Sequence, residues 1–220
     1  MIFIVVPAYN EEKNIGRVIR GLFERGWRDV AVVDDGSSDR TAEEAIAVGA
    51  IVLRHPVNRG QGAALQTGDE YALAKGAEAV AHFDADGQFN PDDIAPAVKA
   101  MAESGVDVVF GSRFLDKRSG VPFLKKYFIL PIARWINFLF TGVLLSDAHN
   151  GFRVLSRRVL EKIKITQDGM AHNSEIVAQI KRGGWRFIER PVEVSYSEYG
   201  QGLAGGLKII RDLFISKITR

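Results

Sequence analysis

The segment AVAHFDADGQFNPDD, residues 79–93, decides the fold. Its apolar start, AVAHF, is typical of a buried strand, and it ends at two aspartates, Asp84 and Asp86, separated by one alanine. Charges at the end of a buried strand are costly unless they have partners, so we expect a partner between these two carboxylates. Asn90 and Pro91 then predict the cap and first residue of a helix.

The same strand-then-helix pattern continues on both sides of this segment. Thr41 and Glu44 open one helix-like run with the spacing of a capping box. Strands alternating with helices over about 110 residues predict βαβ units and a mostly parallel sheet. In such sheets ligands bind at the carboxyl ends of strands, where the loops PAYNEE, DDGSSD and DADGQ fall. The strand-like runs are 2–6, 30–33, 50–53 and 106–110, and the helix-like runs include 15–23 and 63–75.

The second half of the chain is less regular. Residues 151–162 predict a strand followed by a helix, and 173–182 predict another helix. Residues 186–196 predict a last strand, at an edge of the sheet because Pro191 interrupts it. Since no internal repeat, low-complexity run or linker is present, we expect one domain over residues 1–220.

Composition narrows the class of protein. The 220 residues contain no cysteine, which excludes disulfides, thiolate chemistry and cysteine-ligated zinc. Met1 leads directly into an apolar strand with no basic region before it, so we expect no secretory signal. A chain without cysteine suits a cytoplasmic setting. Acidic residues exceed basic ones by eight in 1–112, and basic residues exceed acidic ones by ten in 113–220. The basic half either is an ordinary solvated face or meets an anion such as phosphate, nucleic acid or a membrane surface.

The carboxylates after the fourth strand suit a hard cation. Asp84, Asp86 and Gln88 all offer oxygen ligands, which Mg²⁺ or Mn²⁺ prefers, and such an ion keeps positions for water or substrate phosphates. The alternative is an Asp-Gly turn with solvated carboxylates, and EF-hand ligation is excluded by spacing. A second pair, Asp34 and Asp35, favours a shared cation or ribose hydroxyls over helix capping. The GQGAAL run is a weak phosphate loop, and no P-loop is present.

Taken in order, the motifs resemble a known family. They are VVPAYNEEKNI, VVDDGSSDRTAE, NRGQGAAL, FDADGQFNPDDI, GSRF and SDAHNGFRVLSRRVL. This set resembles glycosyltransferase family 2 proteins of GT-A fold, nearest the dolichyl-phosphate mannosyltransferase and polyprenyl-phosphate glycosyltransferase group. The resemblance covers residues 2–199. It implies a Rossmann-like α/β sheet flanked by helices, with C-terminal amphipathic interface helices. Residues 1–112 would bind the nucleotide sugar, and 113–220 would face the acceptor and the membrane.

The resemblance also implies roles for individual residues. Each has a structural alternative, such as a turn, a packing aromatic or a surface cation. The implied catalytic residues are Asp86, Arg113, Arg153 and Glu175, with His172 and Asn150 as further candidates for the same site. The implied metal ligands are Asp84, Asp86 and Gln88. The implied nucleotide-sugar-binding residues are Pro7, Tyr9, Glu11, Val33, Asp35, Asp84, Ala85, Asp86 and Arg113.

One departure from the family pattern concerns the donor. Dolichyl-phosphate mannosyltransferases carry an arginine and a lysine after the last strand, where this chain has Ser197 and Leu203. Those cations help to hold the donor diphosphate in the relatives. Their absence puts GDP-mannose in doubt and leaves another nucleotide sugar open, with Lys208 or Arg211 as possible substitutes.

The implied reaction is metal-dependent and inverting, with Mg²⁺ or Mn²⁺ as cofactor. A sugar, mannose or glucose, would move from a GDP- or UDP-linked donor to a polyprenyl (dolichyl-type) phosphate. A phosphate acceptor is already largely dianionic at neutral pH and needs no strong base. A sugar-hydroxyl acceptor would need one, for which Asp147 and Glu175 are the candidates.

Membrane contact would explain the basic half. Residues 128–145 are apolar and just long enough to span, but Pro131, Arg134 and Asn137 interrupt them. Basic and aromatic residues there favour helices lying at the headgroup layer over helices packed on the core, so we expect a peripheral enzyme on the inner face of the membrane. A separate membrane-anchoring subunit is a further expected partner. No aromatic-basic motif supports nucleic-acid binding.

Two other classes of function remain open at this point. DADGQ loosely resembles the first motif of haloacid-dehalogenase-like phosphatases, but that motif lies in the first strand and three strands precede it here. A non-catalytic nucleotide-sugar-binding subunit of a membrane complex is the other. Replacing Asp86 by alanine separates an enzyme, which loses turnover, from such a subunit, which has none.

Overall fold

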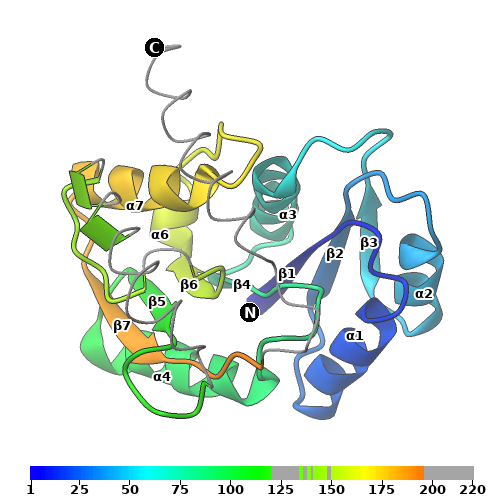
Figure 1. Cartoon of the computed structure of the whole chain (residues 1–220), viewed down its shortest axis with the longest axis horizontal. Coiled ribbons are helices and arrows are strands. Elements are labelled where there is room, and N and C mark those ends of the chain that lie inside the picture. The colour runs from blue at the N-terminus through cyan, green and yellow to red at the C-terminus, as the bar shows by residue number, and fades with distance from the viewer. Residues whose placement is uncertain (120–133, 136–137, 140, 148–149, 196–220) are drawn as a thin grey trace.

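The computed structural model describes residues 1–119, 134–135, 138–139, 141–147 and 150–195 (Figure 1). Within these residues the chain forms a seven-stranded sheet in the order β3-β2-β1-β4-β6-β5-β7. The strands are β1 (Ile2–Ala8), β2 (Val30–Asp34), β3 (Ile51–Arg54), β4 (Ala79–His82), β5 (Val108–Ser112), β6 (Arg153–Ser156) and β7 (Phe187–Pro191). The helices are α1 (Ile15–Glu24), α2 (Thr41–Ala47), α3 (Gln61–Ala74), α4 (Ile94–Ser104), α6 (Arg157–Leu160) and α7 (His172–Arg182), with a 3₁₀ turn η1 (Pro91–Asp93).

The sheet is mostly parallel, which confirms the predicted fold class. Strands β1 to β4 pair in parallel, and so do β5 and β7. Strand β6 runs antiparallel between β4 and β5 and joins the two parallel groups. The apolar pattern does not encode this reversal, because a strand buried on both faces has the same sequence character in either direction.

Helices cover both faces of the sheet, and alternate residues of each strand face them in turn (Figure 1). In β1, Ile4 and Val6 pack in one buried cluster that includes residues of α1 and α4. Phe3 and Val5 pack in the other cluster, which includes residues of α3 and α7. The central strands are therefore apolar along both faces, and polar side chains gather where the strands end.

Several local predictions can be compared with the structure. Asn90 caps η1 as predicted, since its side-chain oxygen accepts a hydrogen bond from the Asp92 backbone N–H at 3.0 Å. The capping box is wrong: Thr41 is the first helical residue, its backbone N–H donates to the Asp39 carboxylate, and Glu44 pairs with Arg40. A carboxylate two residues earlier is a stronger acceptor than the threonine hydroxyl.

The edge position of β7 is confirmed, and the strand ends at Pro191, which has no N–H to donate. Much of the segment 128–145, where interface helices are expected, lies outside the described residues, and so do Ser197, Leu203, Lys208 and Arg211. None of the helices in the described part of the chain combines the length and the apolar character of a membrane span.

Candidate active site

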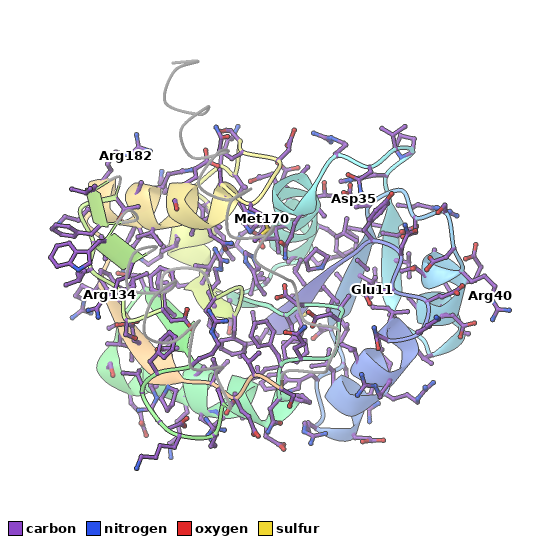
Figure 2. The ribbon with its side chains drawn as sticks, viewed as in Figure 1. Glu11, Asp35, Arg40, Arg134, Met170 and Arg182 are labelled. Carbon is purple, nitrogen blue, oxygen red and sulfur yellow. The ribbon has the colours of Figure 1, made fainter. Side chains whose placement is uncertain are left out.

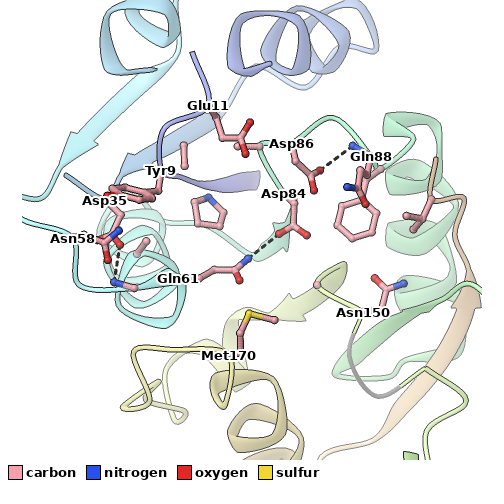
Figure 3. Close-up of a pocket in the computed structure, with 18 of the residues that line it drawn as sticks. Tyr9, Glu11, Asp35, Asn58, Gln61, Asp84, Asp86, Gln88, Asn150 and Met170 are labelled. Atoms are coloured by element: carbon pink, nitrogen blue, oxygen red, sulfur yellow. Dashed lines mark hydrogen bonds between the residues drawn. The ribbon is translucent and has the colours of Figure 1, made fainter. Parts of the chain in front are cut away.

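A cavity of about 520 Å³ opens at the carboxyl ends of β1, β2 and β4 (Figures 2 and 3). Strand β5 ends near Arg113 at the same edge, and antiparallel β6 begins there after Gly151, so five strands deliver residues to one cavity. Ten of the residues nominated from the sequence line it: Pro7, Tyr9, Glu11, Asp35, Asp84, Ala85, Asp86, Gln88, Arg113 and Asn150.

Three carboxyl groups crowd one side of the cavity. Asp84 is buried, and its pKa is raised to about 7, first by burial and then by the negative charge of Asp86. Burial also raises the pKa of Asp86 and of Glu11, and Asp86 adds to the shift at Glu11. The only donor to Asp84 among the described side chains is Gln61, whose Nε2 lies 3.0 Å from Oδ1 (Figure 3). Such crowding favours a proton or a cation between the carboxylates.

The residues present fit a divalent cation. Asp86 accepts a hydrogen bond from the Gln88 backbone N–H at 2.9 Å, which turns the chain so that the Gln88 side chain also lines the cavity. A Cβ on Gly151 would lie 2.7 Å from Asp84 Oδ2, so glycine leaves the space that this carboxylate occupies. No group of three or more His, Cys, Asp or Glu side chains arranged for a metal occurs among the described residues. A cation held by Asp84, Asp86 and Gln88 would therefore need further oxygen ligands from water or substrate.

Asp35 lies on the opposite side of the cavity, beside Tyr9 and Asn58 (Figure 3). Its Oδ1 accepts from the Arg59 backbone N–H at 2.9 Å, and its Oδ2 accepts from the Gly60 backbone N–H at 2.6 Å. The side chain is 3% exposed, so the hydrogen bonds fix both its position and its orientation.

The two adjacent aspartates after β2 have separate surroundings. Asp34 accepts from the Ser37 backbone N–H at 3.1 Å and pairs with Arg54 at 3.0 Å, and it does not line the cavity. The expectation that Asp34 and Asp35 share a cation is therefore not supported by their placement. Asp34 stabilises the turn, and Asp35 alone faces the cavity.

Arg113 lines the cavity next to the end of β5 and is held by a carboxylate. Its Nε and Nη2 each lie 2.6 Å from an oxygen of Asp147, which forms a two-pronged ion pair. Asp147 is 3% exposed and also accepts from the Asn150 side chain at 3.2 Å. Asp147 itself does not line the cavity, so it acts as a support for Arg113 and Asn150.

Arg153 does not line the cavity. The side chain is 1% exposed, its Nε donates to the Gly151 carbonyl at 3.2 Å, and it hydrogen-bonds to Asn173. Burial lowers the pKa of Arg153 to about 10, and the nearby charge of Asp84 opposes that shift. His172 is also fully buried, and burial together with Arg153 lowers its pKa to about 3. Both residues therefore lie behind the cavity wall.

Glu175 and Val33 also lie away from the cavity. The Glu175 carboxylate accepts from the backbone N–H groups of Thr166 and Gln167, both at 2.9 Å. It thereby fixes the loop that brings Met170 to the cavity wall (Figure 3). Val33 is fully buried in the core cluster that contains residues of α3.

Sequence reasoning did not nominate several lining residues. Asn58 and Gly60 belong to NRGQG, where glycine is required: Gly60 has φ 101°, and a Cβ there would lie 2.3 Å from the Asp168 carbonyl oxygen. The glycines of that motif were the available signal. Met170 carries no such signal, because a methionine in a loop has no recognisable spacing.

The chain is similar in sequence to proteins of a known family. The family model described as glycosyl transferase family 2 matches residues 3–164. The UDP-N-acetylglucosamine–dolichyl-phosphate N-acetylglucosaminyltransferase of Methanococcus voltae is 30% identical over 245 residues, covering all of this chain and 97% of the relative. The polyprenol monophosphomannose synthase of Mycolicibacterium smegmatis is 25% identical over 223 residues, covering 96% of this chain and 83% of the relative.

A solved structure shows the same fold. Glucosyl-3-phosphoglycerate synthase from Mycobacterium tuberculosis, crystallised with Mn²⁺, UDP-glucose and phosphoglyceric acid, has a TM-score of 0.71 at 21% identity. The match covers 97% of this chain and 78% of that one, so the mixed sheet and its helices are those of a GT-A fold. Since the family model spans most of the chain and the ordered motifs converge on one cavity, the chain belongs to glycosyltransferase family 2.

Proposed function

We propose that this glycosyltransferase uses a divalent cation, Mg²⁺ or Mn²⁺, to move a hexose-type sugar from a nucleotide diphosphate to a polyprenyl phosphate, with inversion. The observation that carries the proposal is the division of the cavity. One side holds a carboxylate fixed by hydrogen bonds, as suits a nucleoside, and the other holds crowded carboxylates, as suits a cation and a diphosphate.

The chemistry demanded of the protein is stabilisation of the departing diphosphate. A cation at Asp84, Asp86 and Gln88 would neutralise the negative charge that develops there. Arg113 lines the same cavity, and Asp147 orients its guanidinium from behind, so the charge on Arg113 is preorganised. Gln61 holds Asp84 by one hydrogen bond and leaves its second oxygen available.

The placement of the candidate bases supports a phosphate acceptor. Asp147 is engaged by Arg113 and Asn150, and Glu175 is engaged by the 166–167 backbone. Neither carboxylate lines the cavity, so neither is placed to take a proton from a sugar hydroxyl. A phosphate monoester, with a second pKa of about 6, is largely deprotonated at neutral pH and needs no base.

A lipid-linked acceptor fits the surface of the second half. Trp135 and Leu139 are 60% and 77% exposed, and Arg134 lies at the edge of the molecule beside them in sequence (Figure 2). Exposed aromatic and aliphatic side chains next to a cation suit a bilayer headgroup layer. Relatives whose names specify dolichyl phosphate or polyprenol support the same acceptor class. The proposed location is the inner face of the membrane.

The test is sugar transfer to a short polyprenyl phosphate from UDP-glucose, UDP-N-acetylglucosamine and GDP-mannose, with Mn²⁺, Mg²⁺ or EDTA. We expect transfer from one donor that EDTA abolishes. Transfer to a sugar hydroxyl but not to the lipid phosphate would contradict the proposed acceptor. Nucleotide binding without any transfer would indicate a binding subunit instead of an enzyme.

A further inference from the structure

Asp35 has a limited capacity to accept further hydrogen bonds. A carboxylate offers about four lone-pair positions, two on each oxygen. In the described part of the chain, Oδ1 is used twice, by Arg59 N–H at 2.9 Å and by the His55 ring nitrogen Nδ1 at 2.7 Å. Oδ2 is used once, by Gly60 N–H at 2.6 Å. One acceptor position therefore remains, and it is on Oδ2.

The remaining position suits one kind of base edge. Uracil presents a single ring N–H, flanked by two carbonyl oxygens. Guanine presents a ring N–H next to an amino group, and a carboxylate pairs with both donors only if each of its oxygens has a free position. Oδ1 has none. A guanine at Asp35 would thus leave one donor without its partner, and an unpaired polar group in a closed site costs binding energy.

His55 is the residue that fills the second position on Oδ1. It is 7% exposed and follows β3 at the end of the sheet. Because a carboxylate can only accept, Nδ1 carries a proton, and Nε2 lies 2.9 Å from the Thr67 hydroxyl on α3. The imidazole thus joins Asp35 to α3 and stops the carboxylate from rotating. The sequence motifs did not predict a role for His55.

We propose that His55 is a positioning residue that leaves Asp35 a single acceptor position, and that this arrangement selects a uridine diphosphate donor over a guanosine diphosphate donor. The inference rests on the proposed nucleotide-sugar site and adds the base to it. Tyr9 and Asn58 lie on the same side of the cavity, where a base can stack on the tyrosine ring (Figure 3).

Titration calorimetry of the full chain with UDP and with GDP, in the presence of Mn²⁺, tests this without requiring turnover. We expect UDP to bind about tenfold more tightly than GDP, the difference expected for one charge-assisted hydrogen bond. In His55→Ala, the affinity for UDP should fall about tenfold. The affinity for GDP should be unchanged or higher, because an acceptor position on Asp35 Oδ1 becomes free. His55→Asn keeps a donor near Nδ1 and should restore the preference for UDP.

A matched control separates this role from general damage to the fold. His82 also pairs with a buried aspartate, Asp69, at 2.9 Å, but Asp69, unlike Asp35, does not line the cavity. His82→Ala should lower the melting temperature and leave the ratio of the UDP and GDP affinities unchanged. Equal weakening of both nucleotides in His55→Ala would overturn the positioning role. Tighter binding of GDP to the unaltered protein would overturn the base assignment alone, and failure of both nucleotides to bind would overturn the proposed donor site as well.

Discussion

Asp35 and Asp84 both follow strands that end at the same cavity, yet their surroundings are opposite. Asp35 accepts hydrogen bonds from three nitrogen donors, and none of these donors also binds another carboxylate of the cavity. Asp84 is met by one amide, and the charges of Asp86 and Glu11 oppose its ionisation. A carboxylate held by several donors offers direction to a ligand, whereas a crowded one offers charge to a cation. The comparison teaches that residue type alone does not identify the role of an aspartate in this cavity.

The largest effect is expected from removing charge on the crowded side. Asp86→Ala should lower turnover about a thousandfold at saturating donor and Mn²⁺, because the departing diphosphate loses its stabilising cation. Steady-state transfer assays measure this. Glu103→Gln is the control, since it removes one carboxylate from the exposed pair with Lys99 and should have no effect. Full activity of Asp86→Ala would refute the assignment of a cation to Asp84, Asp86 and Gln88.

Displacing Asp84 without changing its charge should have the next largest effect. In Gly151→Ala the new Cβ would lie 2.7 Å from Asp84 Oδ2, so the carboxylate must shift. A shift of this kind should reduce turnover about a hundredfold. The matched control is Gly169→Ala, where a Cβ meets nothing within 4 Å. Similar activities for the two variants would contradict a fixed position for Asp84.

Acid should destabilise the fold through His172, which is buried on the Asp84 side with Arg153. The folded protein keeps His172 neutral down to its pKa of about 3, whereas the unfolded chain binds this proton near pH 6.5. Stability from this group is complete above pH 6.5 and is lost as the pH falls, by about 2 kcal/mol at pH 5. Urea unfolding at pH 5, 6 and 7 measures it. His172→Gln should show a shallower dependence, and an unchanged slope would rule out the buried neutral histidine.

The smallest effect is expected on the hydrogen-bonded side. Tyr9 is 48% exposed and lies beside Asp35 (Figure 3). Tyr9→Leu should weaken UDP binding about tenfold in calorimetry, because a base loses its stacking partner. Tyr9→Phe keeps the ring and should bind normally. If both variants bound equally well, the base would have to lie elsewhere in the cavity.

The sequence predicted the carboxylate loops well, because their position follows from a general property of parallel sheets. Each loop comes directly after an apolar run, and the carboxyl ends of parallel strands meet at one edge. Hence Asp35, Asp84 and Asp86 were nominated together, and the structure brings them to one cavity. The antiparallel direction of β6 was not predictable, since a strand of four residues, Arg153–Ser156, carries no directional signal.

The sequence did not predict which side chains are buried or which partners they bind. Arg153 and Glu175 were expected to be catalytic, and both are engaged away from the cavity, one behind its wall and one in a loop. Val33 belongs to a family motif but packs in the core. His55 was missed because its role depends on a contact with Asp35 twenty residues earlier. Such contacts depend on tertiary distances, which no local pattern encodes.

The antiparallel insertion of β6 has a consequence for the order of folding. Strands β1, β2 and β3 can pair as soon as residue 54 has been made, but one edge of β4 waits for residues 153–156. At about 5–20 residues per second, the intervening segment of about 70 residues takes several seconds to synthesise. During that time the edge of β4 presents unpaired backbone groups to other chains. Nascent protein should therefore be most prone to aggregate in this interval, and a chaperone that covers an exposed strand edge would protect it.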